Sequence, residues 1–138
     1  MAGGDGSEIL PLTFDTPLPI DAVLDELDRT LAASNTAVLV APPGAGKTTR
    51  VPLALLDAPW LRGKKIIMLE PRRIAARASA ERMARTLGER AGETVGYRVR
   101  FGSKMSRATR IEVVTEGIFS RQILDDPELS GIAAVLFD

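Results

Sequence analysis

The sequence contains no cysteine and no histidine among its 138 residues. The lack of cysteine excludes disulfide bonds and thiolate metal sites, and it is compatible with a reducing cytoplasm. The lack of histidine excludes catalysis by imidazole within this chain. We therefore expect a cytoplasmic protein whose chemistry depends on neither side chain.

The sequence also lacks a net charge and a long apolar run. It carries 18 basic and 18 acidic side chains, so a nucleic-acid partner can only be argued from local clusters of charge. No segment has the length of apolar residues that a membrane helix needs, and the N-terminus has no signal-peptide pattern. With 45% hydrophobic and 26% charged residues, the composition is that of one soluble globular domain.

Residues 1–19 differ from the rest of the chain because they are rich in glycine and proline and show little periodicity. This composition predicts a flexible lead-in, followed by one domain over residues 20–138. The domain opens with apolar residues at three- and four-residue steps, which predict a helix with Asp21 as its N-cap. The apolar residues of this helix are Val23, Leu24, Leu27 and Leu31.

Strands and helices are predicted to alternate along the rest of the domain. The strands are expected at 37–40, 66–69, 111–115 and 133–137, and the helices at 51–56, 74–87 and 118–124. In residues 94–101 apolar and basic side chains alternate, which predicts a half-exposed strand with Phe101 on its apolar face. This alternation predicts an α/β fold with a mostly parallel sheet, helices on both faces and ligands at the carboxyl ends of the strands.

Ala41–Thr49 reads Ala-Pro-Pro-Gly-Ala-Gly-Lys-Thr-Thr and lies between the predicted strand at 37–40 and the predicted helix at 51–56. A strand, a loop that contains Gly-Lys-Thr, and a helix form the context of a phosphate-binding P-loop. The first position of the pattern is Ala41 instead of glycine, which is acceptable because this position ends the strand. The alternative is a glycine-rich turn without a ligand.

The residue types of this loop suit a nucleotide. Gly44 and Gly46 allow successive N–H groups to point at one anion. Lys47 is predicted to contact the β- and γ-phosphates, and Thr48 to bind Mg²⁺ at the positive end of the helix. The predicted nucleotide-binding residues of the loop are Pro43, Gly44, Ala45, Gly46, Lys47, Thr48 and Thr49.

Asp138 directly follows the last apolar run, at 133–137. In P-loop NTPases a buried strand near the P-loop brings an aspartate to the Mg²⁺. We therefore predict that Asp138 and Thr48 bind Mg²⁺ and that they form the catalytic set together with Lys47. Many strands end in aspartate without any ligand, and this alternative stays open for the isolated pattern.

Three further stretches follow predicted strands and carry groups that bind phosphate. Arg72 and Arg73 lie in Glu-Pro-Arg-Arg, and paired arginines suit the phosphates of a nucleic acid. Residues 95–110 carry five basic and no acidic side chains, Arg100 among them. Thr115-Glu116-Gly117 can approach a phosphate with a hydroxyl and a glycine backbone. For each stretch, the alternative is a solvated charged surface or an ordinary turn.

In this order and spacing, the motifs resemble those of the first RecA-like domain of DEAH-box ATP-dependent RNA helicases. The resemblance extends from about Leu18 to Asp138 and includes Gly96–Phe101. It implies a RecA-like P-loop NTPase fold, cut off at the Walker B strand, with ATP and Mg²⁺ as cofactors. It also implies that Arg82 stacks on the adenine and that the backbone of single-stranded RNA is bound without base preference. The residues implied for RNA are Arg72, Arg73, Arg100, Thr115 and Gly117.

The resemblance has departures that limit what it implies. Gly102 stands where many relatives carry an acidic residue. The resemblance also implies that Asp138 is the first letter of an Asp-Glu-x-His box and that the chain is cut within this box. We expect the complete protein to couple ATP hydrolysis to RNA translocation and unwinding. We expect the chain as given to bind nucleotide without efficient hydrolysis. The alternatives are a small P-loop nucleotide kinase or metabolic ATPase, and a non-catalytic module that binds ATP or RNA.

Overall fold

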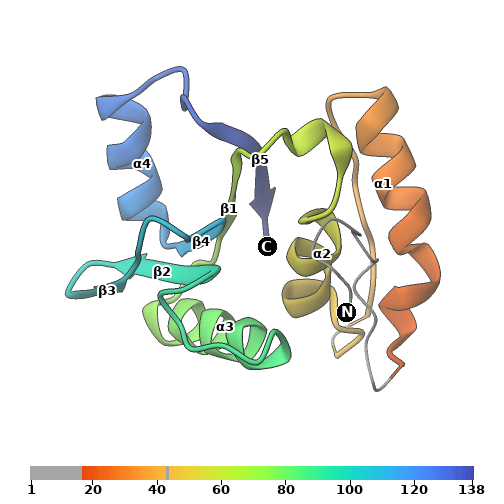
Figure 1. Cartoon of the computed structure of the whole chain (residues 1–138), viewed down its shortest axis with the longest axis horizontal. Coiled ribbons are helices and arrows are strands. Elements are labelled where there is room, and N and C mark those ends of the chain that lie inside the picture. Colours follow the sequence, from red (N-terminus) through yellow and green to blue (C-terminus); the bar gives the residue numbers. More distant parts are fainter. Residues whose placement is uncertain (1–16, 43) are drawn as a thin grey trace, which may run out of the picture.

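The computed structural model describes residues 17–42 and 44–138, so the predictions for Pro43 and for residues 1–16 lie outside the described residues. A five-stranded sheet with the strand order β3-β2-β4-β1-β5 forms the centre of the molecule (Figure 1). The strands are β1 (Lys65–Leu69), β2 (Val95–Val99), β3 (Gly102–Lys104), β4 (Ile111–Val114) and β5 (Ile132–Phe137). Strands β2, β4, β1 and β5 run parallel, and β3 is antiparallel to β2. The predicted mostly parallel α/β sheet is therefore confirmed.

Helices pack on both faces of this sheet. The α-helices are α1 (Leu24–Ala33), α2 (Lys47–Leu55), α3 (Arg73–Thr86) and α4 (Glu116–Asp125), and the short 3-10 helices are η1 (Pro19–Val23) and η2 (Pro59–Leu61). Helix α3 packs on β2 and β4, with α2 beside it and α1 beyond α2, whereas α4 lies on the opposite side of the sheet (Figure 1). The contacts of α4 with the sheet include a hydrogen bond from Gln122 Nε2 to Glu112 Oε1 at 3.1 Å and an edge-on contact between the Phe119 and Phe137 rings. In the part of the chain that the structure describes, no helix is both long and apolar enough to cross a membrane.

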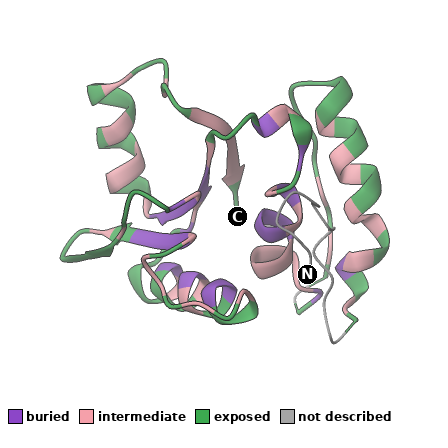
Figure 2. Cartoon of the chain, viewed as in Figure 1, coloured by how far each residue is buried: buried purple, intermediate pink, exposed green. Residues whose placement is uncertain are grey.

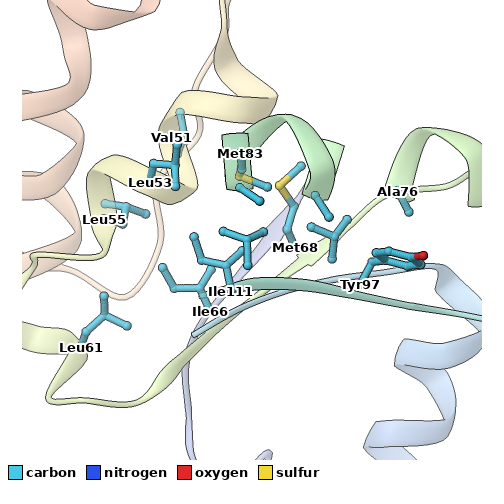
Figure 3. Packing of buried hydrophobic residues seen from close by; sticks show 14 of the residues in the cluster. Val51, Leu53, Leu55, Leu61, Ile66, Met68, Ala76, Met83, Tyr97 and Ile111 are labelled. Atoms are coloured by element: carbon cyan, nitrogen blue, oxygen red, sulfur yellow. The ribbon is translucent and has the colours of Figure 1, made fainter. Parts of the chain in front are cut away.

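The hydrophobic core lies between the sheet and helices α2 and α3 (Figures 2 and 3). Alternate residues of the central strands point into it, among them Ile66 and Met68 of β1 and Ile111 of β4, all at most 2% exposed. Helix α3 places Ala76, Ala80 and Met83 against them, and the small alanines allow the helix to approach the sheet closely. Each fully buried large side chain contributes roughly 1.5–3 kcal/mol, so this layer holds the strand ends in place.

The predicted strand at 37–40 is wrong. The segment forms no strand in the described structure, and Val38 and Val40 are 92% and 88% exposed. A strand needs a neighbouring strand that offers N–H and C=O groups. Strand β5 is the last strand of the described sheet on this side, and a cavity of about 280 Å³, lined by Leu39 and Val135 among others, lies between β5 and this segment. The apolar run leads into the P-loop, but as an unpaired extended segment.

Two smaller predictions also differ from the structure. Asp21 is not the N-cap of the first α-helix, because η1 begins at Pro19 and α1 begins only at Leu24. Proline is favoured at the first position of a helix, which explains the earlier start, inside the predicted lead-in. The predicted strand at 94–101 ends at Val99, and Phe101 lies in the turn to β3 with 77% of its surface exposed. The short strand β3 was not predicted, because its three exposed residues show no apolar pattern.

Candidate nucleotide site and nucleic-acid edge

A cavity of about 700 Å³ opens beside the P-loop. It brings together residues from distant parts of the sequence: the P-loop, the end of β5 and helix α3. The lining residues include Leu18, Gly44, Ala45, Gly46, Lys47, Thr48, Thr49, Arg50, Arg82 and Asp138. We call this space the nucleotide cavity. Its lining contains all the residues predicted from the sequence to bind nucleotide, except Pro43, which the structure does not describe.

The backbone of the P-loop has the conformation that an anion site requires. Gly44 and Gly46 have φ angles of 81° and 98°, in the left-handed region that favours glycine. The Ala45 N–H donates to the Pro42 carbonyl at 3.2 Å, and helix α2 starts at Lys47 directly after the loop. The first N–H groups of a helix have no partner within that helix, and its N-terminus carries a partial positive charge. The loop and the helix start thus present N–H donors to the cavity, as a phosphate chain requires.

The two predicted Mg²⁺ ligands lie next to each other at the end of this cavity. The Thr48 hydroxyl donates to Asp138 Oδ2 at 3.1 Å, and Lys47 Nζ lies 4.0 Å from Asp138 Oδ1. Hydroxyl and carboxylate oxygens are ligands that suit Mg²⁺, which usually keeps water and phosphate oxygens as its other ligands. The described residues contain no group of three or more acidic, histidine or cysteine side chains that could hold a metal.

Glu70 is a site residue that was not predicted from the sequence. Glu70 directly follows β1, and Asp138 directly follows β5. The two strands are neighbours in the sheet, and the Asp138 N–H donates to the Leu69 carbonyl at 3.2 Å. The pKa of Glu70 is raised to about 7, mainly by burial and further by a hydrogen bond to Asp138 and repulsion from its charge, while Arg72 opposes the shift. Glu70 can therefore carry a proton near neutral pH, where an ordinary glutamate is ionised. Only the pairing of β1 with β5 reveals this contact, since the two residues are far apart in the sequence.

The residues predicted to contact RNA lie along one edge of the sheet. Because β2, β4 and β1 are parallel and paired in register, the segments that follow them emerge side by side. These segments hold Arg100 after β2, Thr115 and Gly117 after β4, and Arg72 and Arg73 after β1. We call these five residues the strand-end row. Asp138 follows β5, the next strand, so the row adjoins the nucleotide cavity.

Local contacts in the strand-end row favour a negatively charged ligand. Arg72 and Arg73 are exposed and stand at the N-terminus of α3, whose first turn contains no acidic residue. Their charges add to the positive end of the helix dipole instead of compensating it. The Arg100 and Arg73 guanidinium carbons lie 4.8 Å and 5.8 Å from the centre of the exposed Phe101 ring. Phe101 thus contacts the strand-end row, as Glu70 contacts Asp138. The sequence does not reveal this contact, because the alternating pattern assigns Phe101 to the apolar face of a strand.

The basic run at 95–110 does not act as one surface. Arg110 precedes β4, and its Nε and Nη2 donate to the Lys64 carbonyl, which precedes β1, at 3.3 Å and 3.2 Å. These contacts lie at the amino ends of the strands, opposite the strand-end row. Of the five basic residues, Arg100 is the one that directly follows a parallel strand at the carboxyl edge.

Comparison with known proteins extends these observations. No family model matches the chain. The chain is 52% identical over 121 residues to the ATP-dependent RNA helicase HrpB of Escherichia coli (strain K12), an alignment that covers 88% of this chain and 15% of that protein. It is 35% identical over 124 residues to the ATP-dependent RNA helicase HrpA of Borreliella burgdorferi, covering 90% of this chain and 15% of that protein.

A solved structure gives the same result. The crystal structure of the Escherichia coli DEAH/RHA helicase HrpB matches with a TM-score of 0.84 and 51% identity, over 88% of this chain and 15% of that one. The homologues of the chain are DEAH-box ATP-dependent RNA helicases. The resemblance of the motifs to the helicase family is thereby confirmed, and the fold is consistent with a RecA-like domain of these helicases. The chain spans about 15% of the length of the helicases it matches.

The helicase homology concerns the family and the fold, and it implies the use of ATP. The individual roles of Lys47, Thr48, Arg82 and Asp138, and of the strand-end row, stay predictions. The structure adds that the first four lie around one cavity and that the row lies at the adjoining edge.

Proposed function

We propose that this chain is the ATP-binding part of a DEAH-type RNA helicase, with ATP and Mg²⁺ in the nucleotide cavity and the RNA backbone on the strand-end row. The contact that carries the proposal is the 3.1 Å hydrogen bond from Thr48 to Asp138 at the P-loop. It joins the first turn of α2 to the end of β5, across 90 positions of sequence, and so creates an oxygen-lined place for a cation beside the phosphate-binding loop.

Within this proposal each residue has a role that its position supports. Lys47 and the N–H groups of Gly46, Lys47 and Thr48 hold the β- and γ-phosphates, and Thr48 and Asp138 hold Mg²⁺, which neutralises the phosphate charge during hydrolysis. Arg82, on α3 at the wall of the cavity, stacks on the adenine. In the complete protein, hydrolysis drives movement along single-stranded RNA, with which the arginines make contacts that do not depend on base sequence.

The nucleotide-kinase alternative predicts a different response to RNA. A nucleotide kinase uses its basic residues for a small acceptor, so its nucleotide affinity is indifferent to RNA. The row of exposed arginines beside the nucleotide cavity and the helicase homologues favour RNA over a small acceptor. RNA held by arginine–phosphate contacts is expected to dissociate steeply as salt is raised.

The nucleotide half of the proposal is tested with Lys47→Ala and with Lys64→Ala as a control that removes an exposed lysine outside the cavity. We expect Lys47→Ala to weaken binding of a fluorescent ATP analogue by roughly 100-fold in the presence of Mg²⁺, because two charge-assisted contacts are lost. Lys64→Ala should bind like the unaltered chain. Equal affinity of the Lys47→Ala variant and the unaltered chain would show that nucleotide binds elsewhere or not at all.

A further inference from the structure

The segment that precedes the first α-helix packs directly on the P-loop. The Ile20 N–H donates to the Ala45 carbonyl at 3.1 Å, and both Ile20 and Ala45 are 2% exposed. Ala45 lies between the two glycines whose φ angles shape the loop. This contact therefore fixes one peptide of the P-loop from outside the nucleotide cavity.

A charged contact attaches the same segment to the first turn of α2. Asp21 Oδ2 accepts the Leu18 N–H at 2.9 Å and Arg50 Nη1 at 2.6 Å. The Arg50 N–H in turn donates to the Gly46 carbonyl at 2.9 Å, so the residue that binds Asp21 also belongs to the turn that begins at the loop. Burial raises the pKa of Asp21, but the Leu18 N–H and the Arg50 guanidinium outweigh it, and the pKa lies below its ordinary value of 3.8. Asp21 is thus charged at neutral pH.

The packing leaves little room around Gly46. A Cβ at that position would lie 2.6 Å from Leu18 Cδ1 and 3.2 Å from Ile20 Cγ2. Leu18 also lines the nucleotide cavity. The segment thus approaches the loop on the side of Gly46, which it contacts through apolar side chains, while Asp21 holds it in place through hydrogen bonds.

We propose that Leu18–Asp21, which we call the N-terminal brace, holds the P-loop in its phosphate-binding conformation, with Asp21 as a positioning residue. Asp21 does not line the cavity and acts through Leu18, Ile20 and Arg50. This inference rests on the proposed nucleotide site. Without the brace, the P-loop is in its binding conformation in a smaller fraction of the molecules. The apparent affinity for nucleotide decreases in proportion to this fraction.

The brace makes a prediction that a general loss of stability does not. The P-loop holds the β-phosphate, which ADP has and AMP lacks. Weakening the brace should therefore reduce affinity for ADP more than affinity for AMP. A purely structural role would change the temperature of unfolding and leave the ratio of the two affinities unaltered for the folded protein.

The test compares Asp21→Ala and Asp21→Asn with Asp25→Ala, which removes an exposed acidic residue from the first turn of α1. Affinities are measured by displacement of a fluorescent ADP analogue by ADP and by AMP, well below the unfolding temperature of each variant. We expect Asp21→Ala to weaken ADP binding about five- to tenfold, the effect of losing charged hydrogen bonds. AMP binding should change less than about twofold, and Asp21→Asn, which still accepts the Leu18 N–H, should lie in between.

The outcomes of this experiment test the N-terminal brace, whereas Lys47→Ala tests the nucleotide site. If Asp21→Ala fails to fold, Asp21→Asn under the same conditions decides. Unaltered ADP affinity in the folded Asp21 variants, or an equal loss for ADP and AMP, would overturn the brace while Lys47→Ala still tests the site itself. An equal loss of ADP affinity in Asp25→Ala and Asp21→Ala would also overturn the brace, because the effect would then come from negative charge near α1 in general.

Discussion

The nucleotide cavity and the strand-end row are neighbours, but they are built in different ways. The cavity depends on backbone geometry and on contacts between side chains, such as Thr48 with Asp138. The row consists mainly of exposed side chains attached to the ends of strands, such as Arg72 and Arg73. The difference indicates that binding in the cavity fails when one contact is lost, whereas binding on the row weakens by increments and depends on salt.

The largest effect on the row is expected from Arg72→Ala combined with Arg73→Ala. Loss of two phosphate contacts should weaken binding of a single-stranded RNA oligonucleotide about tenfold or more, and should reduce the slope of log affinity against log salt by about 1.4. Fluorescence anisotropy over a series of salt concentrations measures both quantities. A loss of affinity with an unaltered salt slope would contradict a backbone contact by these arginines. Arg62→Ala, an exposed arginine after η2, serves as the control.

A second prediction concerns pH and belongs to the cavity. The pKa of Glu70 is raised from 4.5 to about 7 in the folded chain, so protonated Glu70 favours the folded state. This contribution to the free energy of unfolding is fully present below about pH 4.5 and is lost as the pH rises through 7. The Gln side chain of Glu70→Gln cannot ionise and loses no stability in this way. As the pH rises from about 5 to about 8, the free energy of unfolding of this variant should therefore increase by on the order of 1–3 kcal/mol relative to that of the unaltered chain. Urea unfolding at both pH values, with EDTA to remove divalent cations, measures the difference.

The control for this pH effect is Glu128→Gln, which alters an exposed glutamate in the loop between α4 and β5. It should leave the pH dependence of stability unaltered. A Glu70→Gln variant with the same pH dependence as the unaltered chain would mean that the pKa of Glu70 is not raised in the folded chain.

The smallest effect is expected from Phe101→Leu. The ring is exposed, so the free energy of unfolding should change by no more than about 0.5 kcal/mol. The Arg73 and Arg100 guanidinium groups would lose their cation–π partner, which is worth about 0.5–1 kcal/mol at exposed sites, so RNA affinity should fall about two- to fivefold. Phe101→Tyr keeps an aromatic ring and should bind RNA like the unaltered chain. Equal RNA affinity of the Leu and Tyr variants would contradict a role of the ring.

Two apolar runs explain how much of the fold could be predicted from the sequence. Residues 37–40 and 66–69 have similar composition, and both precede a predicted functional loop. The second run forms β1 at the centre of the sheet, with Ile66 fully buried, whereas Val38 of the first is 92% exposed. Apolar composition predicts the tendency to form a strand, but the strand also requires a partner, which local sequence does not reveal.

The candidate site shows the same limit. The P-loop was predicted from adjacent residues because its chemistry is local. Glu70 and the N-terminal brace were missed because their roles depend on contacts with Asp138 and Ala45, which only the folded chain brings close. Asp138 was predicted because its position after an apolar run is a local signal.

The most direct test of two separate sites measures both ligands on the same two variants. Affinities for a fluorescent ATP analogue with Mg²⁺ and for a single-stranded RNA oligonucleotide are determined for Lys47→Ala and for the Arg72→Ala, Arg73→Ala double variant. The cavity and the row predict that the first variant loses nucleotide and keeps RNA, and that the second loses RNA and keeps nucleotide. Parallel loss of both ligands in each variant, or loss of neither, would contradict this division of the molecule.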